Sequence, residues 1–226
     1  MQDALEPALS AIAGTTITTT AAGRTDRGVH ARLQIVHFDT DAQRPSSAWV
    51  RGVNALLPDA VAVLWSHEVP DEFHARFSAR ARTYRYQLLN RPVRPALEAH
   101  YLGWFHQALD VERMRAAAAL FVGEHDFSAF RSSECQAKSP VRTIHQLEVS
   151  RTDETINFVV RANAFLHHMV RNLVGTLVYV GKGKHPPEWV RELLESRDRA
   201  KAAPTFGPEG LYLERIEYEA KWSLPV

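Results

Sequence analysis

A short loop at residues 22–31, with the sequence Ala-Gly-Arg-Thr-Asp-Arg-Gly-Val-His-Ala, carries the residues best suited to chemistry. It places one carboxylate, Asp26, between Arg24 and Arg27, and two glycines bound this charged stretch. Apolar runs flank the loop, which predicts that it joins two strands. The neighbouring guanidinium groups favour the charged form of a carboxylate, so we expect Asp26 to be ionised at neutral pH. An ionised aspartate can act as a nucleophile or as an electrostatic stabiliser.

The same loop also has a purely structural interpretation. In an Asx turn the side chain of Asp26 would bind its own backbone, and Gly28 would supply a positive φ angle. Taken alone, a Thr-Asp-x-Gly turn favours this structural interpretation. The two flanking arginines favour the chemical one.

A second stretch combines arginine with aromatic residues. No acidic residue lies between Phe73 and Leu97, whereas six arginines do: Arg76, Arg80, Arg82, Arg85, Arg91 and Arg94. Tyr84 and Tyr86 lie among them. Guanidinium groups suit the phosphate backbone and aromatic rings suit bases, so this pattern indicates a nucleic-acid surface. A solvated cationic strand edge would give the same pattern.

The eleven histidines do not form a recognisable metal motif. Two ligands on one helix must be three or four residues apart, and His167 and His168 are adjacent. No His-Glu-x-x-His pattern, phosphate-binding loop or dinucleotide fingerprint occurs. We therefore expect no metal and no zinc hydrolase, and we interpret the histidines as polar residues at the boundary of the core.

Composition narrows the class of protein. The chain has 226 residues, 45% hydrophobic and 23% charged, with a net charge of +1, which is ordinary for a globular protein. No apolar run approaches the roughly 20 residues that span a bilayer, and the N-terminus lacks the pattern of a secretory signal. Cys135 is the only cysteine, which excludes an internal disulfide or a cysteine zinc cluster. We expect a cytoplasmic protein that does not interact with membranes.

Hydrophobic periodicity predicts alternating helices and strands. The expected helices cover residues 5–13, 46–57, 110–122, 166–181 and 187–194. The expected strands cover residues 15–21, 33–38, 60–69, 80–89, 141–151, 155–163 and 211–218. Several consecutive strands are close enough to pair antiparallel. This order predicts an α+β fold, with helices packed on a mostly antiparallel mixed sheet. Both halves contain helices and paired strands, so we expect two pseudo-duplicated halves, residues 1–100 and 101–226, with the active-site cleft between them.

Four blocks of this chain resemble the TruA-type tRNA pseudouridine synthases. Residues 23–30, Gly-Arg-Thr-Asp-x-Gly-Val-His, are similar to the family signature. The other blocks are Phe-His-Ala-Arg-Phe-Ser-Ala at 73–79 with Arg-x-Tyr-Arg-Tyr at 82–86, Asn-Ala-Phe-Leu-His-His-Met-Val-Arg-Asn at 163–172, and Gly-Leu-Tyr-Leu at 210–213. They run in family order across almost the whole chain, so together they are highly specific.

The resemblance implies an isomerase that converts uridine to pseudouridine at positions 38–40 of the tRNA anticodon stem-loop. It also implies that the reaction needs no cofactor and that the enzyme is a homodimer whose subunits share one tRNA. Matched residue by residue, the resemblance assigns five positions: Asp26 as the catalytic aspartate, Arg24 in base flipping, Tyr84 stacked on the target uracil, Arg171 as the basic partner of the aspartate, and Leu211 as a wall of the uracil pocket. Arg76, from the arginine-rich stretch, is a further candidate for substrate binding.

The family normally begins with a strand and a basic-aromatic loop before its first helix. This chain starts at that helix, so the resemblance implies that the first strand of the N-terminal half is missing.

Two other functions are compatible with the residues. One is a non-catalytic RNA-binding module that uses the same surface. The other is an aspartate-dependent hydrolase of nucleosides or sugars, although glycosidases usually need a pair of carboxylates and no second one is evident near Asp26.

Overall fold

The structure, a computed structural model, describes residues 1–225 and groups them into two compact units. Unit 1 contains Met1–Arg24, Gln34–Arg80 and the C-terminal segment from Ile216; unit 2 contains Thr25–Leu33 and Ala81–Arg215.

Unit 1 is built around helix α1, Gln2–Ala13. Its apolar residues recur at helical spacing, and Gly14 ends the helix in the left-handed conformation with φ 80°, as the sequence predicts. The buried face of α1 forms a small core; its members are Leu5, Ala8, Leu9, Ala13, Ile17 and Val53. Strands β1, Thr20–Ala21, and β3, Val36–His37, pair antiparallel in this unit.

Three predicted elements of unit 1 are shorter or different in the structure. The strand expected at 15–21 is reduced to β1, because side chains of α1 bind its backbone: Ser10 Oγ accepts from Ile17 N–H and Glu6 Oε1 from Thr19 N–H. The strand expected at 33–38 is reduced to β3. The helix expected at 46–57 is helical only over 46–54, where the π-helical turn η1, Ala48–Gly52, interrupts it.

The strand predicted at 60–69 is wrong, since no strand is assigned there. Asn54 gives the physical reason. Its amide donates to the Val63 carbonyl at 2.8 Å and accepts from the Val63 N–H at 2.7 Å. One side chain thus satisfies the backbone groups that a neighbouring strand would otherwise bind.

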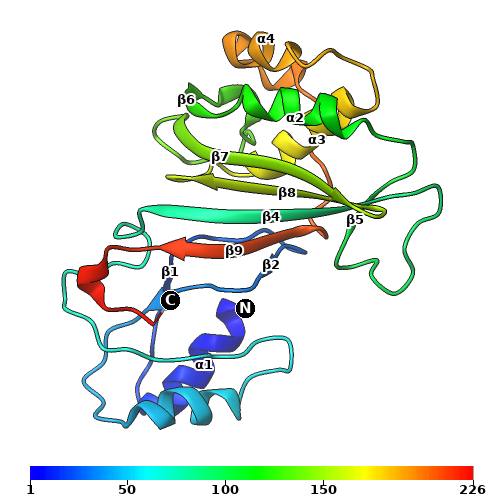
Figure 1. The fold of residues 1–226 in the computed structure, drawn as a ribbon. Helices are drawn as coiled ribbons and strands as arrows, with labels where there is room; N and C mark the ends of the chain where they lie inside the picture. Colours follow the sequence, from blue (N-terminus) through cyan, green and yellow to red (C-terminus); the bar gives the residue numbers. More distant parts are fainter. Residues whose placement is uncertain (226) are drawn as a thin grey trace. The chain divides into compact units, whose positions relative to one another are not determined.

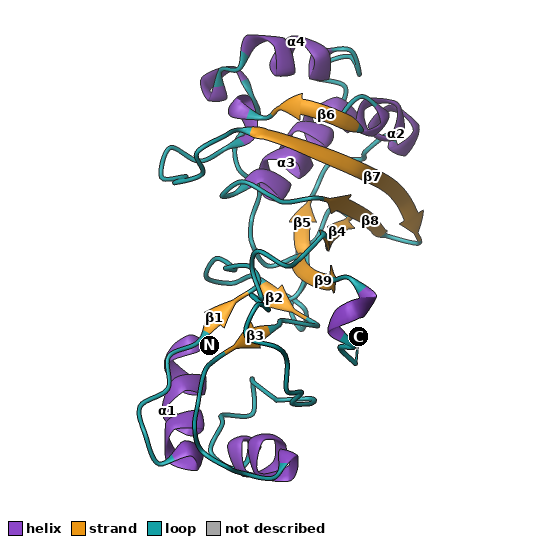
Figure 2. Cartoon of the chain, turned by 90° about the vertical axis from the view of Figure 1, so that its left-hand side faces the viewer, coloured by secondary structure: helices purple, strands orange, loops and turns teal. Residues whose placement is uncertain are grey.

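Unit 2 is organised by a seven-stranded sheet in the order β2-β9-β4-β8-β7-β6, with β5 beside β4. Figures 1 and 2 show these strands. Their bounds are β2 His30–Ala31, β4 Ala81–Asn90, β5 Gly103–Phe105, β6 Gly123–Asp126, β7 Val141–Thr152, β8 Thr155–Ala162 and β9 Leu211–Glu217. The β4–β8, β7–β8 and β6–β7 pairs are antiparallel, whereas β2–β9 and β4–β5 are parallel.

The long strands follow the predicted pattern closely. Strand β4 pairs with β8 from Arg82 opposite Ala162 to Leu89 opposite Thr155, and its residues Tyr84, Tyr86 and Leu88 are all buried. Strands β7 and β8 form the predicted hairpin, whose turn includes Asp153 at φ 52°.

Three helices of unit 2 lie on the same side of this sheet (Figure 1). They are α2 Val111–Ala119, α3 Met169–Gly181 and α4 Trp189–Ser196. Asp110 caps α2 as predicted, accepting a hydrogen bond from the Arg113 N–H. Helix α3 begins three residues later than expected, because His168 has a left-handed backbone with φ 63°.

The described elements confirm an α+β fold with a mixed, mostly antiparallel sheet. Short 3₁₀ turns complete them at Ser128–Phe130, Arg199–Lys201 and Ala220–Trp222. Within residues 1–225, no helix combines the length and apolarity needed to cross a membrane. The internal duplication and the division near residue 100 stay predictions.

Candidate active site

Asp26 lies in the loop between β1 and β2, as predicted. Its backbone carbonyl accepts a hydrogen bond from the Val29 N–H at 3.1 Å, which closes a β-turn. Gly28 has φ 84° in this turn, a conformation that glycine adopts without steric cost. The structural role expected of Gly28 is therefore confirmed, while the side chain of Asp26 is engaged elsewhere.

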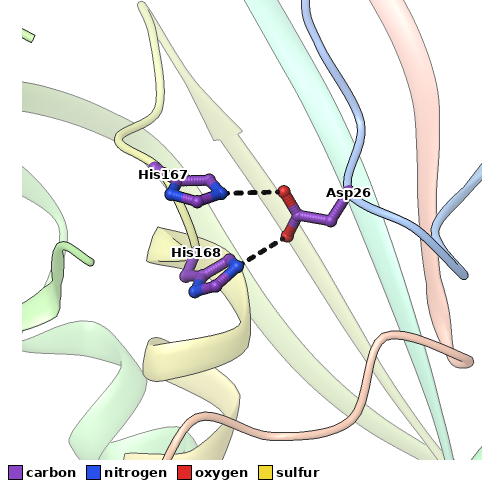
Figure 3. Close-up of side chains that lie close together, drawn as sticks. All are labelled: Asp26, His167 and His168. Carbon is purple, nitrogen blue, oxygen red and sulfur yellow. Dashed lines mark hydrogen bonds and ion pairs between the residues drawn. The ribbon is translucent and has the colours of Figure 1, made fainter. Parts of the chain in front are cut away.

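Three basic side chains surround the carboxylate of Asp26. His167 Nε2 lies 3.1 Å from Oδ1, and His168 Nε2 lies 3.2 Å from Oδ2 (Figure 3). Arg171 Nη1 donates to Oδ2 at 3.1 Å. Among the described residues, the charged group that pairs with this carboxylate is thus Arg171, and not the sequence neighbours Arg24 and Arg27.

The two histidines reach one carboxylate because they precede the helix and do not lie on it. The left-handed residue His168 turns the chain into α3, and the two rings lie 4.0 Å apart between centroids. The His167 carbonyl accepts from the Ser132 N–H at 3.0 Å, which fixes this turn. The two side chains are 35% and 27% exposed, which agrees with their interpretation as polar residues at the boundary of the core. Their contacts with Asp26 were not predicted, since the spacing rule for helical ligands does not apply to residues outside a helix.

Arg171 is held on both sides. Its Nε donates to the Phe206 carbonyl at 2.8 Å, and the Phe206 N–H donates to the Arg171 carbonyl at 3.2 Å. Only 14% of its side chain is exposed. A guanidinium that is fixed and shielded in this way stabilises a neighbouring negative charge more strongly than an exposed one.

Burial lowers the pKa of His168, and the neighbouring His167 and Arg171 lower it further, against an opposing effect of Asp26. At neutral pH, His168 is therefore an uncharged imidazole. The positive charge that faces Oδ2 of Asp26 then comes from Arg171.

Asp26, His167 and His168 are also the residues of this site that could hold a metal ion, because their ligand atoms lie within 4.8 Å of one another. Imidazole and carboxylate are suitable zinc ligands. However, Arg171 already donates to Oδ2 of Asp26, and its charge would repel a divalent cation at that oxygen. The arrangement fits a carboxylate held ready for reaction better than it fits a metal cage.

Tyr84 and Leu211 belong to unit 2, which also contains Asp26. Tyr84, on β4, is 8% exposed and contacts Phe165 edge-to-face with ring centroids 4.9 Å apart. Burial raises the pKa of Tyr84 to about 12, with a further upward effect from Asp26 and a downward effect from Arg82. Its hydroxyl is therefore protonated at any physiological pH. Sequence reasoning assigned no role to Phe165, although it stands two residues before His167.

Leu211 begins β9 and is 5% exposed. Its N–H donates to the Pro208 carbonyl at 2.9 Å, and a Cβ at Gly28 would lie 3.0 Å from Pro208 Cγ. The turn that carries Asp26 thus packs on the segment that leads into Leu211. Of the residues predicted for the site, the structure pairs Asp26 directly with Arg171, and Asp26 acts electrostatically on Tyr84. The places of Tyr84 and Leu211 in one substrate pocket stay predictions.

A hollow of about 800 Å³ opens beside His168. Its lining is rich in arginine and hydroxyl groups: Ser128, Arg131, Ser132, Ser133, Arg197, Arg199 and Thr205 are among the residues that form it. Such a lining suits a phosphate-bearing chain.

The two remaining predicted residues, Arg24 and Arg76, belong to unit 1, and their roles stay predictions. The contacts of His167 and His168 with Asp26 were not predicted. The available signal was their position directly before the helix that carries Arg171, where two adjacent side chains can face one partner.

Comparison with known proteins identifies the family of this chain. The family model described as tRNA pseudouridine synthase matches residues 1–78 and 117–219. The tRNA pseudouridine synthase A of Nitrosomonas eutropha is 57% identical over 225 residues, covering 100% of this chain and 81% of that protein. Those of Thiobacillus denitrificans and Chromobacterium violaceum are each 59% identical, over 100% of this chain and 86% of the relative. Because the family model matches most of the chain and these relatives are more than half identical to it over its full length, the chain belongs to the tRNA pseudouridine synthase family.

Proposed function

We propose that this protein isomerises uridine to pseudouridine in tRNA, at positions 38–40 of the anticodon stem-loop, with Asp26 as the catalytic residue. The observation that carries the proposal is the carboxylate of Asp26, which Arg171 and His167 bind and His168 contacts, in a chain that belongs to this family.

The chemistry requires little beyond a positioned carboxylate. The bond between N1 of uracil and C1′ of the ribose breaks, the base turns, and C5 bonds to C1′. The proton lost from C5 is balanced by one gained at N1, so the reaction consumes no oxidant, reductant or other co-substrate. Asp26 can form a covalent bond with the sugar or with the base, and either bond divides one difficult step into two easier ones.

The residues around Asp26 support this role. Arg171 stabilises the ionised carboxylate before attack and when it leaves again. The contacts to both oxygens restrict rotation of the carboxylate, so the attacking oxygen is oriented before substrate binds. We infer that His167 and His168 are positioning residues for Asp26.

The target base must leave its stack before it can react. We propose that the ring of Tyr84 then stacks on the extruded uracil and that Leu211 forms an apolar wall of its pocket. Arg24 would fill the space that the base vacates, and Arg76 would bind the RNA. The protonated hydroxyl of Tyr84 fits a stacking role and does not fit a role as a base.

We also propose that the protein acts as a homodimer in which two copies bind one tRNA. Light scattering of the purified protein tests this directly. A monomer with full activity would contradict it.

The experiment that tests the function is incubation of the protein with an unmodified tRNA transcript, followed by mapping of pseudouridine in the product. We expect pseudouridine at one or more of positions 38–40. Free uracil would instead indicate a hydrolase, and unchanged but bound tRNA would indicate an RNA-binding module. The hydrolase is disfavoured because the described partners of Asp26 are two histidines and an arginine, whereas glycosidases need a second carboxylate.

A further inference from the structure

We propose that the turn at residues 74–78 in unit 1 is a base-stacking site, at which the exposed ring of Phe77 stacks on an unpaired base of the tRNA. This inference rests on the proposed function, which supplies the RNA. It assigns the turn a contact separate from the reaction at Asp26.

Phe77 is a large apolar side chain that the described structure leaves in solvent, with 76% of its surface exposed. Its ring stacks on the imidazole of His74, with centroids 4.2 Å apart and planes inclined by 30°. The guanidinium carbon of Arg76 lies 5.7 Å from the centroid of the Phe77 ring. The turn therefore presents an exposed aromatic ring that carries the imidazole of His74 stacked on it and the positive charge of Arg76 over it.

The turn that carries Phe77 is held by an unusual set of hydrogen bonds. His74 Nδ1 accepts from the N–H groups of both Arg76 and Phe77, at 3.1 and 3.2 Å. The His74 carbonyl accepts from the Ser78 N–H at 2.8 Å, and Ser78 Oγ accepts from the His74 N–H at 3.0 Å. These four bonds fix the backbone on both sides of Phe77.

Two further contacts anchor the turn to the rest of unit 1. His37 Nδ1 accepts from the Ala75 N–H at 3.1 Å, and the Tyr218 hydroxyl donates to the Ala75 carbonyl at 2.6 Å. A side chain on so rigid a backbone loses little conformational entropy when it binds a partner. The hydrogen bonds of the turn thus hold Phe77 in a fixed position on the surface. The exposed ring itself does not pack in the core.

The chemistry of the turn favours a nucleobase as the partner. Proteins recognise unpaired RNA bases by stacking them on aromatic rings and arginine planes, with positive charge along the backbone. Arg76 places a positive charge over the ring. A protein partner that needed only an apolar contact would not require the neighbouring cation.

Binding of an unmodified tRNA transcript to the Phe77→Ala variant tests the inference. Loss of one stacked base should weaken binding about 5- to 150-fold. Phe77→Tyr should bind like the original protein, because it keeps the ring. Phe77→Leu should resemble Phe77→Ala, because it keeps an apolar side chain but has no flat surface. The matched control is Leu64→Ala, which removes another exposed apolar side chain of unit 1, 67% exposed, and should leave binding unchanged.

A blunt-ended RNA duplex separates stacking from general affinity, since it offers no unpaired base. We expect the original protein and Phe77→Ala to bind this duplex equally. Equal binding of tRNA by both proteins would overturn the inference. So would a Phe77→Ala variant that binds tRNA normally but changes its oligomeric state in light scattering, because the ring would then contact a second copy of the chain. Pseudouridine formation by the original protein is measured in parallel, so that a failure of the proposed function is seen separately from the role of Phe77.

Discussion

Arg171 Nη1 donates a hydrogen bond to Asp26 Oδ2 at 3.1 Å, although 145 residues separate the two in the chain. One residue comes from the loop before β2 and the other from the first turn of α3. Their pairing places a charged carboxylate beside a fixed cation, with two imidazoles on the same group. The catalytic proposal depends on this relationship.

The pairing predicts that Arg171→Ala will reduce activity strongly. Hydrogen bonds to charged groups contribute about 1.5–3 kcal/mol, which corresponds to roughly 10- to 150-fold in kcat. Arg171→Lys should recover part of this loss, since it keeps the charge but not the second contact to the Phe206 carbonyl. Single-turnover rates on tRNA measure the effect. A full kcat in Arg171→Ala would show that the ion pair does not support the reaction.

The lowered pKa of His168 predicts a pH-dependent contribution to stability. Below about pH 6.5 the unfolded chain binds a proton at this histidine, while the folded protein resists it, so the free energy of unfolding falls as pH falls through this window. His168→Gln removes this contribution, and its stability should depend less on pH between about 5 and 7. Burial also lowers the pKa of His37 and His185, so the difference between the two proteins isolates His168. The prediction would be contradicted if the free energy of unfolding of the original protein and of His168→Gln, measured in urea, changed equally with pH.

Gly28 is predicted to matter for both stability and rate. Its φ of 84° disfavours any residue with a Cβ, and that Cβ would press on Pro208. Gly28→Ala should therefore lose about 1–2 kcal/mol of stability and should also displace Asp26. Gly183→Ala is a matched control, because Gly183 has φ 80° with nothing within 4 Å of its Cβ position. We expect both variants to be less stable in urea but only Gly28→Ala to lose kcat. Equal kcat values for Gly28→Ala and Gly183→Ala would show that the conformation of the turn at Gly28 does not affect the reaction.

The proposed stacking role of Tyr84 predicts different results for two substitutions. Tyr84→Phe keeps the ring and should retain most activity, because the raised pKa of the hydroxyl excludes its ionisation near neutral pH. Tyr84→Ala removes the ring and should raise KM and lower kcat. If Tyr84→Phe were as inactive as Tyr84→Ala, the hydroxyl would have a role that stacking does not explain.

Local sequence signals were sufficient where an element satisfies its own backbone. Helix α2 begins at the predicted cap, Asp110, and the β7–β8 hairpin turns at Asp153. They failed where a distant side chain binds the backbone. Asn54 replaces a strand partner for Val63, and nothing in the local pattern at 60–69 indicates this.

The candidate site shows the same division. Family motifs identified Asp26 and Arg171 as partners, and the structure brings them together. The contribution of His167 and His168 depends on one left-handed residue before α3, and a helical periodicity analysis assumes regular backbone at that point. The sequence also suggested that Arg24 and Arg27 would stabilise the charge of Asp26, whereas the structure pairs it with Arg171. Proximity in the chain does not decide which charged groups lie close together in the fold.

The measurement that tests the central claim most directly uses tRNA labelled with tritium at C5 of uridine and the Asp26→Asn variant. Isomerisation releases the C5 hydrogen to water, so the label reports the reaction itself, and tRNA binding is measured on the same protein. We predict that the original protein releases tritium and forms pseudouridine, whereas Asp26→Asn binds tRNA with similar affinity and releases none. Tritium release by Asp26→Asn at the original rate would contradict the account.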